Sequence, residues 1–205
     1  MHNCYGKLIV VSGPSGVGKS TVIGKVMQQR SDLCFSVSAT TRDPRPGEAD
    51  GRDYFFVSWD KFDSMIENDE LLEHAEYVGN CYGTPRTYVE KKRAEGKHVL
   101  LDIEVQGARQ VMERVPDAIK IFVIPTSLQA LEDRLRGRNT DTEEKIHSRL
   151  ARARSEYREA SFYDYIVIND DPDVAAKELD SIITAELCRY DDRKVFLHLD
   201  GNPNR

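Results

Sequence analysis

Gly13 opens an eight-residue stretch whose residue types suit phosphate binding. It consists of Gly13, Pro14, Ser15, Gly16, Val17, Gly18, Lys19 and Ser20, and it matches the pattern G-x-x-x-x-G-K-[ST]. Glycines let backbone N–H groups turn inward around a phosphate, and a helix starting there adds a favourable dipole. Lys19 brings positive charge to the β- and γ-phosphates, while the Ser20 hydroxyl can ligate Mg²⁺. The stretch therefore predicts a phosphate-binding loop (P-loop) for a nucleoside triphosphate. A turn that binds nothing would leave the lysine charge unexplained.

The elements around this loop are those that the motif requires. Short apolar runs bounded by turn signals predict buried parallel strands at 8–11, 99–101, 119–124 and 165–168. Helical patterns lie between them at 19–29, 105–115, 127–136, 143–160 and 173–189. This alternation predicts an α/β fold, a P-loop NTPase-type parallel sheet with helices on both faces.

Residues 36–83 break this rhythm. They contain strand-like pieces at 36–38, 54–57 and 72–78 and a Gly79-Asn80 turn suited to a hairpin, which together predict an inserted mixed α/β lobe. Thr84 and Pro85 then predict a helix with a capping hydroxyl and proline at its first position, ending at Gly96.

A second interruption, at 137–142, separates two arginine-rich helices. Thr140 and Glu143 have the spacing of a capping box. We expect one domain over 1–205, with a core at 1–35, 89–136 and 146–205, an inserted lobe at about 36–88 and a short lid at about 137–145.

Asp102 follows the apolar run 99–101 and is the expected acidic partner of the P-loop on the Mg²⁺ side. The alternative for Asp102 is a simple cap at a strand end, where aspartate is common. In the inserted lobe, Arg42 and Arg45 lie on a turn-rich stretch and suit a bidentate clamp for a monophosphate. Tyr54 and Tyr82 can add hydroxyl donors, although a tyrosine taken alone is more often a half-buried packing residue.

Several further segments resemble the guanylate kinase family, in order and over nearly the whole chain. They are SVSATTR at 36–42, GRDYFFV at 51–57, GNCYGT at 79–84, LDIEVQG at 101–107 and INDD at 168–171. The resemblance implies a P-loop nucleoside monophosphate kinase that phosphorylates GMP, and also dGMP, from ATP with Mg²⁺.

The resemblance also implies residue roles. Arg42, Arg45, Tyr54 and Tyr82 would hold the GMP phosphate, and Ser38, Glu73, Thr84 and Glu104 would surround guanine, with Asp102 beside Mg²⁺ and the phosphates. Arg134, Arg138 and Arg149 would act from the lid side, and Asn169 would lie on the adenine side. Thr84 and Glu104 stand where many members have serine and aspartate, and both keep the hydrogen-bonding chemistry. Solvated ion pairs are the alternative for the lid arginines, and a solvated charge is the alternative for Glu73.

Two other functions remain open at this point: a P-loop kinase for another small acceptor, and a guanylate-kinase-like module that binds peptides without catalysis. The intact P-loop argues against the second. A formal net charge of −6 argues against nucleic-acid binding, and the absence of a long apolar run argues against a membrane segment. The four scattered cysteines suit reduced thiols, and the N-terminus suggests no signal peptide, so we expect a cytoplasmic protein. A homo-oligomer is compatible with the sequence.

Overall fold

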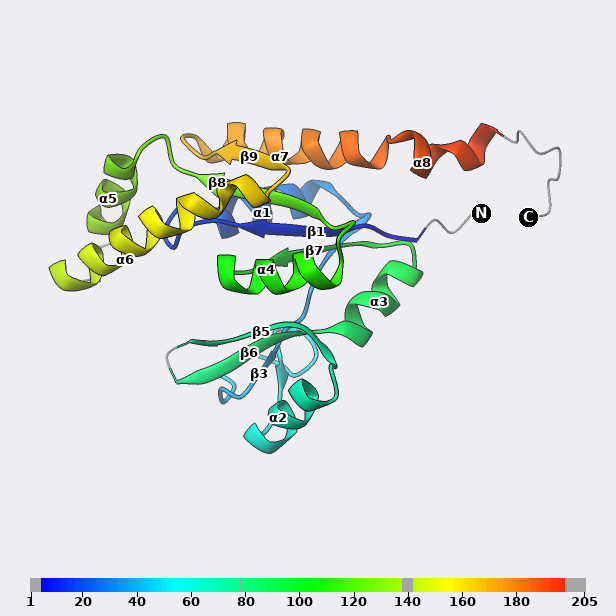
Figure 1. Cartoon of the computed structure of the whole chain (residues 1–205), viewed down its shortest axis with the longest axis horizontal. Coiled ribbons are helices and arrows are strands. Elements are labelled where there is room, and N and C mark those ends of the chain that lie inside the picture. The colour runs from blue at the N-terminus through cyan, green and yellow to red at the C-terminus, as the bar shows by residue number, and fades with distance from the viewer. Residues whose placement is uncertain (1–4, 78, 138–141, 198–205) are drawn as a thin grey trace.

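The computed structural model describes residues 5–77, 79–137 and 142–197, and its centre is a five-stranded sheet. The strands are β1 (Leu8–Ser12), β2 (Leu33–Phe35), β7 (His98–Asp102), β8 (Ile119–Ile124) and β9 (Tyr165–Ile168). They lie in the order β2-β7-β1-β8-β9, and every neighbouring pair is parallel (Figure 1). The predicted α/β fold with a parallel sheet is confirmed.

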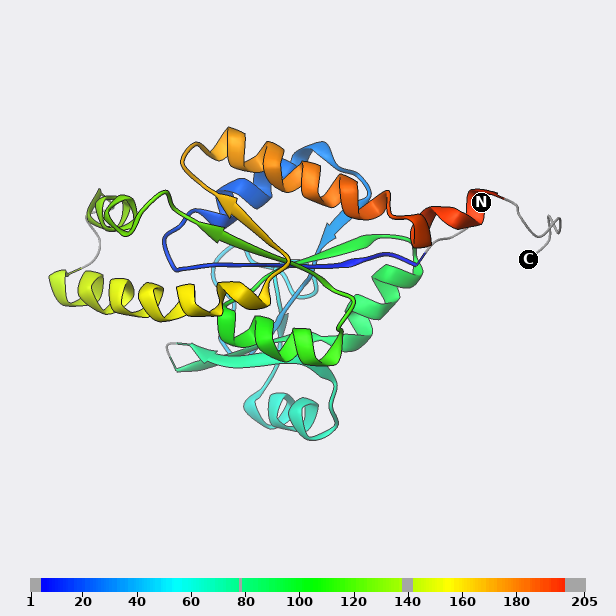
Figure 2. The same cartoon turned by 45° about the horizontal axis from the view of Figure 1, so that its top comes forward.

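Both faces of this sheet are buried by helices. In β1, Ile9 and Val11 join a core with α1 (Lys19–Gln29) and α7 (Pro172–Leu187). Leu8 and Val10 alternate to the other face and join a core with α3 (Arg86–Ala94) and α4 (Val105–Arg114). Figure 2 shows these two helix pairs on opposite sides of the sheet. Burial on both faces explains why the strands are continuous apolar runs.

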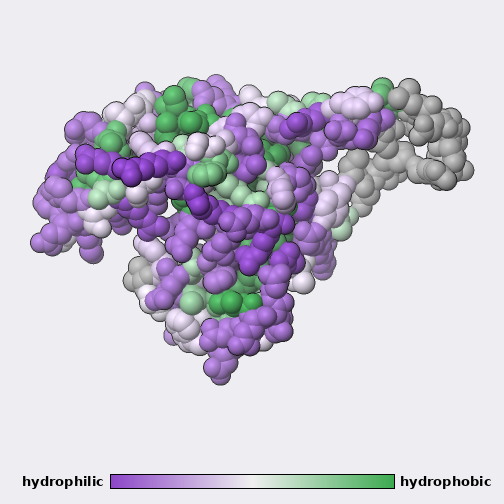
Figure 3. Space-filling model, in the orientation of Figure 1, coloured by the Kyte–Doolittle hydropathy of each residue, from purple (hydrophilic) through white to green (hydrophobic). Residues whose placement is uncertain are grey.

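A second sheet forms what we call the small lobe, with strands β3 (Ala39–Thr40), β4 (Phe55–Phe56), β5 (Leu71–Tyr77) and β6 (Asn80–Pro85) in the order β4-β3-β6-β5. Helix α2 (Trp59–Glu67) packs on it through a separate small core of Ala39, Phe62, Met65 and Leu71. Strands β5 and β6 pair antiparallel up to Tyr77 and Asn80, as the hairpin prediction requires. Figure 3 shows the surface notched between this lobe and the main body.

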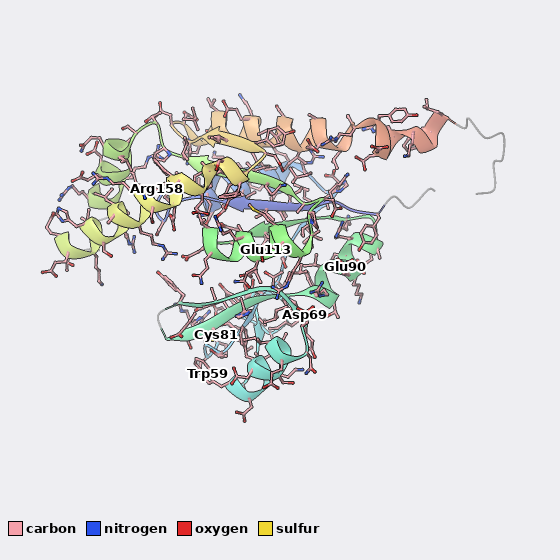
Figure 4. The ribbon with its side chains drawn as sticks, in the orientation of Figure 1. Trp59, Asp69, Cys81, Glu90, Glu113 and Arg158 are labelled. Atoms are coloured by element: carbon pink, nitrogen blue, oxygen red, sulfur yellow. The ribbon has the colours of Figure 1, made fainter. Side chains whose placement is uncertain are left out.

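Helices α5 (Leu128–Gly137) and α6 (Glu143–Glu156) form a third packed unit beside the sheet, through Leu131, Leu135, Ile146 and Leu150. A 3₁₀ segment, η1 (Tyr157–Phe162), continues α6, and α8 (Tyr190–Arg193) with η2 (Lys194–Leu197) continues α7. In Figure 4, Cys81 marks the small lobe, Glu113 marks α4 and Arg158 marks η1. None of the described helices is both long and apolar enough to cross a membrane.

The structure corrects several local predictions. Residues 36–38 are not a strand, and strand β2 and helix α2 were not predicted. The helix after β6 begins at Arg86 with Pro85 as its N-cap, so the prediction that Thr84 caps it is wrong. The cap of α6 is Thr142, whose hydroxyl accepts from the Lys145 N–H, whereas Thr140 lies outside the described residues.

Candidate active site

The predicted P-loop joins β1 to α1, and its conformation depends on glycine. Gly13 has φ 148°, and a Cβ there would lie 2.1 Å from the carbonyl oxygen of Val123 on β8. Gly18 has φ 93° and is the N-cap of α1, and a Cβ there would lie 2.6 Å from Asn169 Nδ2. Other residues rarely adopt these angles. Only glycine also lets the loop pass this close to the Val123 carbonyl of β8 and to the Asn169 side chain just after β9. The N-terminal end of α1, with its positive dipole, therefore faces the loop.

Lys19, Ser20 and Asp102 meet beside this loop. Lys19 Nζ donates to the Gly13 carbonyl at 2.8 Å and lies 4.0 Å from Asp102 Oδ1. Ser20 Oγ donates to Asp102 Oδ2 at 3.1 Å. Burial raises the pKa of Asp102, while Lys19 and the Ser20 bond act in the opposite direction. Asp102 is the last residue of β7, so the adjacent parallel strands bring it next to the loop.

Arg134 and Asn169 brace the loop from the side of α5 and β9. Asn169 Nδ2 donates to the Val17 carbonyl at 2.7 Å, and Arg134 Nη1 donates to the same oxygen at 3.1 Å. Arg134 Nη2 donates to the carbonyls of Asn169 at 2.7 Å and Asp170 at 3.0 Å. Both residues were predicted on the nucleotide side, but this bracing was not foreseen. Their contacts place them at the P-loop. The adenine-side role of Asn169 and the ATP-binding role of Arg134 stay predictions.

A cavity of about 210 Å³ lies between the small lobe and the main body. Six of the predicted site residues line it, namely Ser38, Tyr54, Glu73, Tyr82, Asp102 and Glu104. The first four come from the small lobe and its flanking segments, and the last two from the end of β7 and the start of α4. The structure therefore brings together most of the acceptor residues that the sequence predicts.

Glu73 is the buried acid of this cavity. Glu73 is only 5% exposed, and Thr84 Oγ1 donates to its Oε1 at 2.6 Å. Burial raises the pKa of Glu73 to about 7, and the Thr84 bond only partly offsets this. A Cβ at Gly107 on α4 would lie 2.5 Å from Glu73 Oε2, so the missing side chain of Gly107 makes room for the carboxylate. The hydroxyl of Thr84 thus orients Glu73 rather than capping a helix.

Arg42 is held on the lobe side by Glu48. Its Nη2 donates to Glu48 Oε1 at 2.9 Å and to Oε2 at 3.0 Å, and its Nη1 donates to the Asp43 carbonyl at 2.7 Å. Hydrogen bonding to Glu48 raises the pKa of Arg42. The guanidinium lies 5.3 Å from the Tyr54 ring centroid, within the range of a cation–π contact.

The other members of the predicted phosphate clamp are Tyr54, Tyr82 and Arg45, and they do not all lie together. The Tyr54 and Tyr82 rings meet edge to face at 6.0 Å. Arg45 is exposed and does not line the cavity, although its backbone N–H donates to Glu48 Oε2 at 2.8 Å. Sequence reasoning missed the role of Glu48. Its position three residues after Arg45, in the same turn-rich stretch, was the available signal.

Glu104 is the N-cap residue of α4, but its side chain makes no capping hydrogen bond. Instead it forms an ion pair with Arg152 of α6, a residue that sequence reasoning did not single out. Arg149 lies on the same helix and is partly buried, without lining the cavity. Arg138 lies outside the described residues. The structure therefore describes only part of the predicted lid.

Comparisons with known proteins agree with this geometry. The guanylate kinase family model matches residues 5–186. The chain is 54% identical over 186 residues to a guanylate kinase of Lactococcus lactis, covering 91% of both chains. It is 49% identical over 197 residues to a guanylate kinase of Desulfitobacterium hafniense, covering 96% of this chain and 98% of the relative. The crystal structure of a guanylate kinase from Anaplasma phagocytophilum is similar, with 35% identity, a TM-score of 0.70 and coverage of 91% of this chain and 88% of that one.

Proposed function

Since the chain belongs to the guanylate kinase family, we propose that it transfers the γ-phosphoryl group of ATP to GMP, and also to dGMP. The products are ADP and the corresponding diphosphate. The observation that carries this proposal is the position of Asp102. Its carboxylate accepts from Ser20 of the P-loop and also lines the cavity of the small lobe. A triphosphate on the loop and a monophosphate in the cavity would therefore meet at this residue.

The chemistry of the cavity suits guanine. The Watson–Crick edge of guanine offers N1–H and N2–H₂ donors beside the O6 acceptor. In our proposal Glu73 and Glu104 accept from these donors, and Ser38 and Thr84 supply hydroxyls. Adenine would leave such groups unpaired, at about 1–3 kcal/mol for each buried group. This supports discrimination between the two purines.

The phosphate of GMP would be held by Arg42 and Arg45 with the hydroxyls of Tyr54 and Tyr82. A phosphate oxygen that attacks ATP is already ionised, so the reaction requires alignment and charge stabilisation rather than a general base. On the donor side the loop Gly13–Ser20 would hold the phosphates through its N–H groups, with Lys19 compensating the charge that develops on the transferred group.

The residues beside the loop also fit Mg²⁺. This ion prefers oxygen ligands, and it usually takes one or two carboxylates together with substrate phosphates and water. Ser20 Oγ and the carboxylate of Asp102 lie 3.1 Å apart and supply such oxygens. In the described part of the chain no cluster of three or more His, Cys, Asp or Glu side chains could hold a metal. Bound there, the ion would neutralise phosphate charge, and Ser20 and Asp102 would hold it, the latter partly through water.

Residues at about 36–88 would act as the GMP lobe, and those at about 137–145 as a lid that carries Arg138. Arg134, Arg149 and Asn169 would serve the ATP side. Closure of these parts would exclude water, which would otherwise hydrolyse ATP. We propose the cytoplasm as the compartment and leave the number of subunits open. A peptide-binding module without catalysis is not favoured, because Gly13, Gly18, Lys19 and Ser20 are all present and arranged as a P-loop.

A panel of four monophosphates tests this function. ADP formation from ATP and Mg²⁺ is measured by a coupled assay with GMP, AMP, CMP or UMP as acceptor. We expect GMP to support turnover and the other three to support little. Equal stimulation by AMP would contradict the guanine assignment, and it would favour a kinase for another acceptor.

A further inference from the structure

We propose that Arg152 is a positioning residue that holds the carboxylate of Glu104 in the orientation needed to bind guanine. This inference rests on the proposed function, because it assigns a role to a side chain that acts through Glu104. Arg152 does not line the cavity and none of the roles given above involves it.

Glu104 requires an external partner. Although it is the N-cap residue of α4, its side chain makes no bond to the N–H groups of that helix. Its side chain is 46% exposed, so packing alone does not fix its rotamer. A carboxylate that must meet the edge of a base with defined geometry would bind weakly if it sampled several rotamers.

Arg152 supplies that partner from α6. Its Nη2 donates to Glu104 Oε2, across 48 positions of sequence. Because only one carboxylate oxygen of Glu104 has this partner, the other remains for an N–H group of the base. The planar guanidinium also suits this task, since its donors have fixed directions.

Arg152 is itself held in place. Its Nε donates at 2.9 Å to Oε1 of Glu156, one turn further along α6, and the Glu156 side chain is only 11% exposed. The order of contacts is therefore Glu156 to Arg152 to Glu104, from a buried anchor to the cavity. A solvent-directed ion pair would not need a buried anchor of this kind.

The charges support the same role. Glu73 and Glu104 line one cavity, and two carboxylates that face a single base repel each other. Arg152 places a positive charge beside one of them without entering the cavity. It therefore offsets part of the repulsion between the two carboxylates when both face the base.

Steady-state kinetics of the full chain test this role, with GMP and ATP varied separately. For Arg152→Ala we expect KM for GMP to rise about three- to tenfold. This range is the effect of losing a charge-assisted hydrogen bond, made smaller because the pair is half-exposed and screened by solvent. KM for ATP should stay within about twofold, because the hydrogen bonds of Arg152 go to Glu104 and Glu156 rather than to the P-loop. Arg152→Lys should recover part of the loss, since it keeps the charge but not the fork.

Two further variants separate this role from others. In the Glu104→Ala background, Arg152→Ala should cause no additional rise in KM for GMP. Arg154→Ala is the matched control, because Arg154 is an exposed arginine of the same helix and no ion pair joins it to any residue that the structure describes. Thermal unfolding checks that each variant is folded at the assay temperature. Arg152→Ala should lower the unfolding temperature most, because it leaves the largely buried carboxylate of Glu156 without this partner.

The outcomes are distinct. If Glu104→Ala raises KM for GMP and Arg152→Ala does not, or if the two effects simply add, the role of Arg152 is overturned while the proposed function stands. A loss confined to kcat or to KM for ATP would also overturn it, because Arg152 would then act on the phosphates. Failure of the parent chain to phosphorylate GMP would instead overturn the proposed function and this role with it.

Discussion

Glu73→Gln should stabilise the protein at alkaline pH while it weakens GMP binding. Glu73 is 5% exposed, and burial raises its pKa from 4.5 to about 7. An amide of nearly the same shape keeps an oxygen that can accept from Thr84 Oγ1, but it carries no charge. The substitution therefore removes the cost of burying an ion and leaves the local packing in place.

The size and sign of this effect follow from the pKa. Well below pH 4.5 the carboxyl of Glu73 is protonated in both the folded and the unfolded state, so no ionisation favours unfolding and the protein has its full stability with respect to this group. As the pH rises, the unfolded state ionises first, and part of this stability is lost up to about pH 7. By linkage the loss is about 1 kcal/mol at pH 5 and about 3 kcal/mol at pH 8. Glu73→Gln should therefore gain about 2 kcal/mol more at pH 8 than at pH 5.

Urea unfolding of both proteins at pH 5 and pH 8 measures this difference. Groups such as Asp102 titrate in both proteins, so their contribution cancels when the two are compared at each pH. At the same time KM for GMP should rise at least about tenfold, because a charge-assisted bond to the base is lost. If the stability difference between the two proteins is the same at both pH values, Glu73 does not bury a charge and the reasoning is refuted.

Two other substitutions test the site more locally. Gly107→Ala should raise KM for GMP and lower stability by about 1 kcal/mol, because the new Cβ would lie 2.5 Å from Glu73 Oε2 and displace that carboxylate. The loss of its bond from Thr84 outweighs the helix-propensity gain of alanine over glycine, which is about 1 kcal/mol. A stabilised variant with unchanged KM would contradict this. Lys19→Met should keep the fold, as circular dichroism can check, because among the described residues Lys19 bonds only the Gly13 carbonyl and approaches Asp102. It should reduce kcat by orders of magnitude, because the charge beside the transferred phosphate is lost. Unchanged turnover would remove the P-loop from the mechanism.

The sequence predicted the parts of the fold that depend on strong local patterns. The strands at 119–124 and 165–168 and the helix at 19–29 have the predicted bounds, because buried parallel strands are continuous apolar runs and the P-loop motif marks the start of a helix. The small lobe was predicted less well. Strands β3 and β4 are two residues each, and α2 follows them with only Ser58 as a capping signal. Such short elements exist through tertiary pairing rather than local propensity.

Residue types and family motifs predicted most of the residues that line the cavity between the small lobe and the main body, but not what holds them. Thr84 illustrates this limit. Its position before a proline suggested a helix cap, whereas burial beside Glu73 directs its hydroxyl to that carboxylate. Glu48, Arg152 and Glu156 were missed for the same reason. Charged residues on turns and helices are usually solvated, and only the folded arrangement shows which of them meet a functional side chain.

These supporting contacts share a physical logic. Lys19 bonds a carbonyl of its own loop, Arg42 bonds Glu48, and Glu104 bonds Arg152. Each of these three charged groups therefore has a partner within the protein that satisfies it before the substrate arrives. A phosphate that meets Lys19 or Arg42 gives each cation a more highly charged partner in place of one already present. Guanine needs only the second oxygen of Glu104, so Arg152 can stay in place. Binding thus rearranges hydrogen bonds among groups that are already oriented, and less of the interaction energy is spent on ordering side chains.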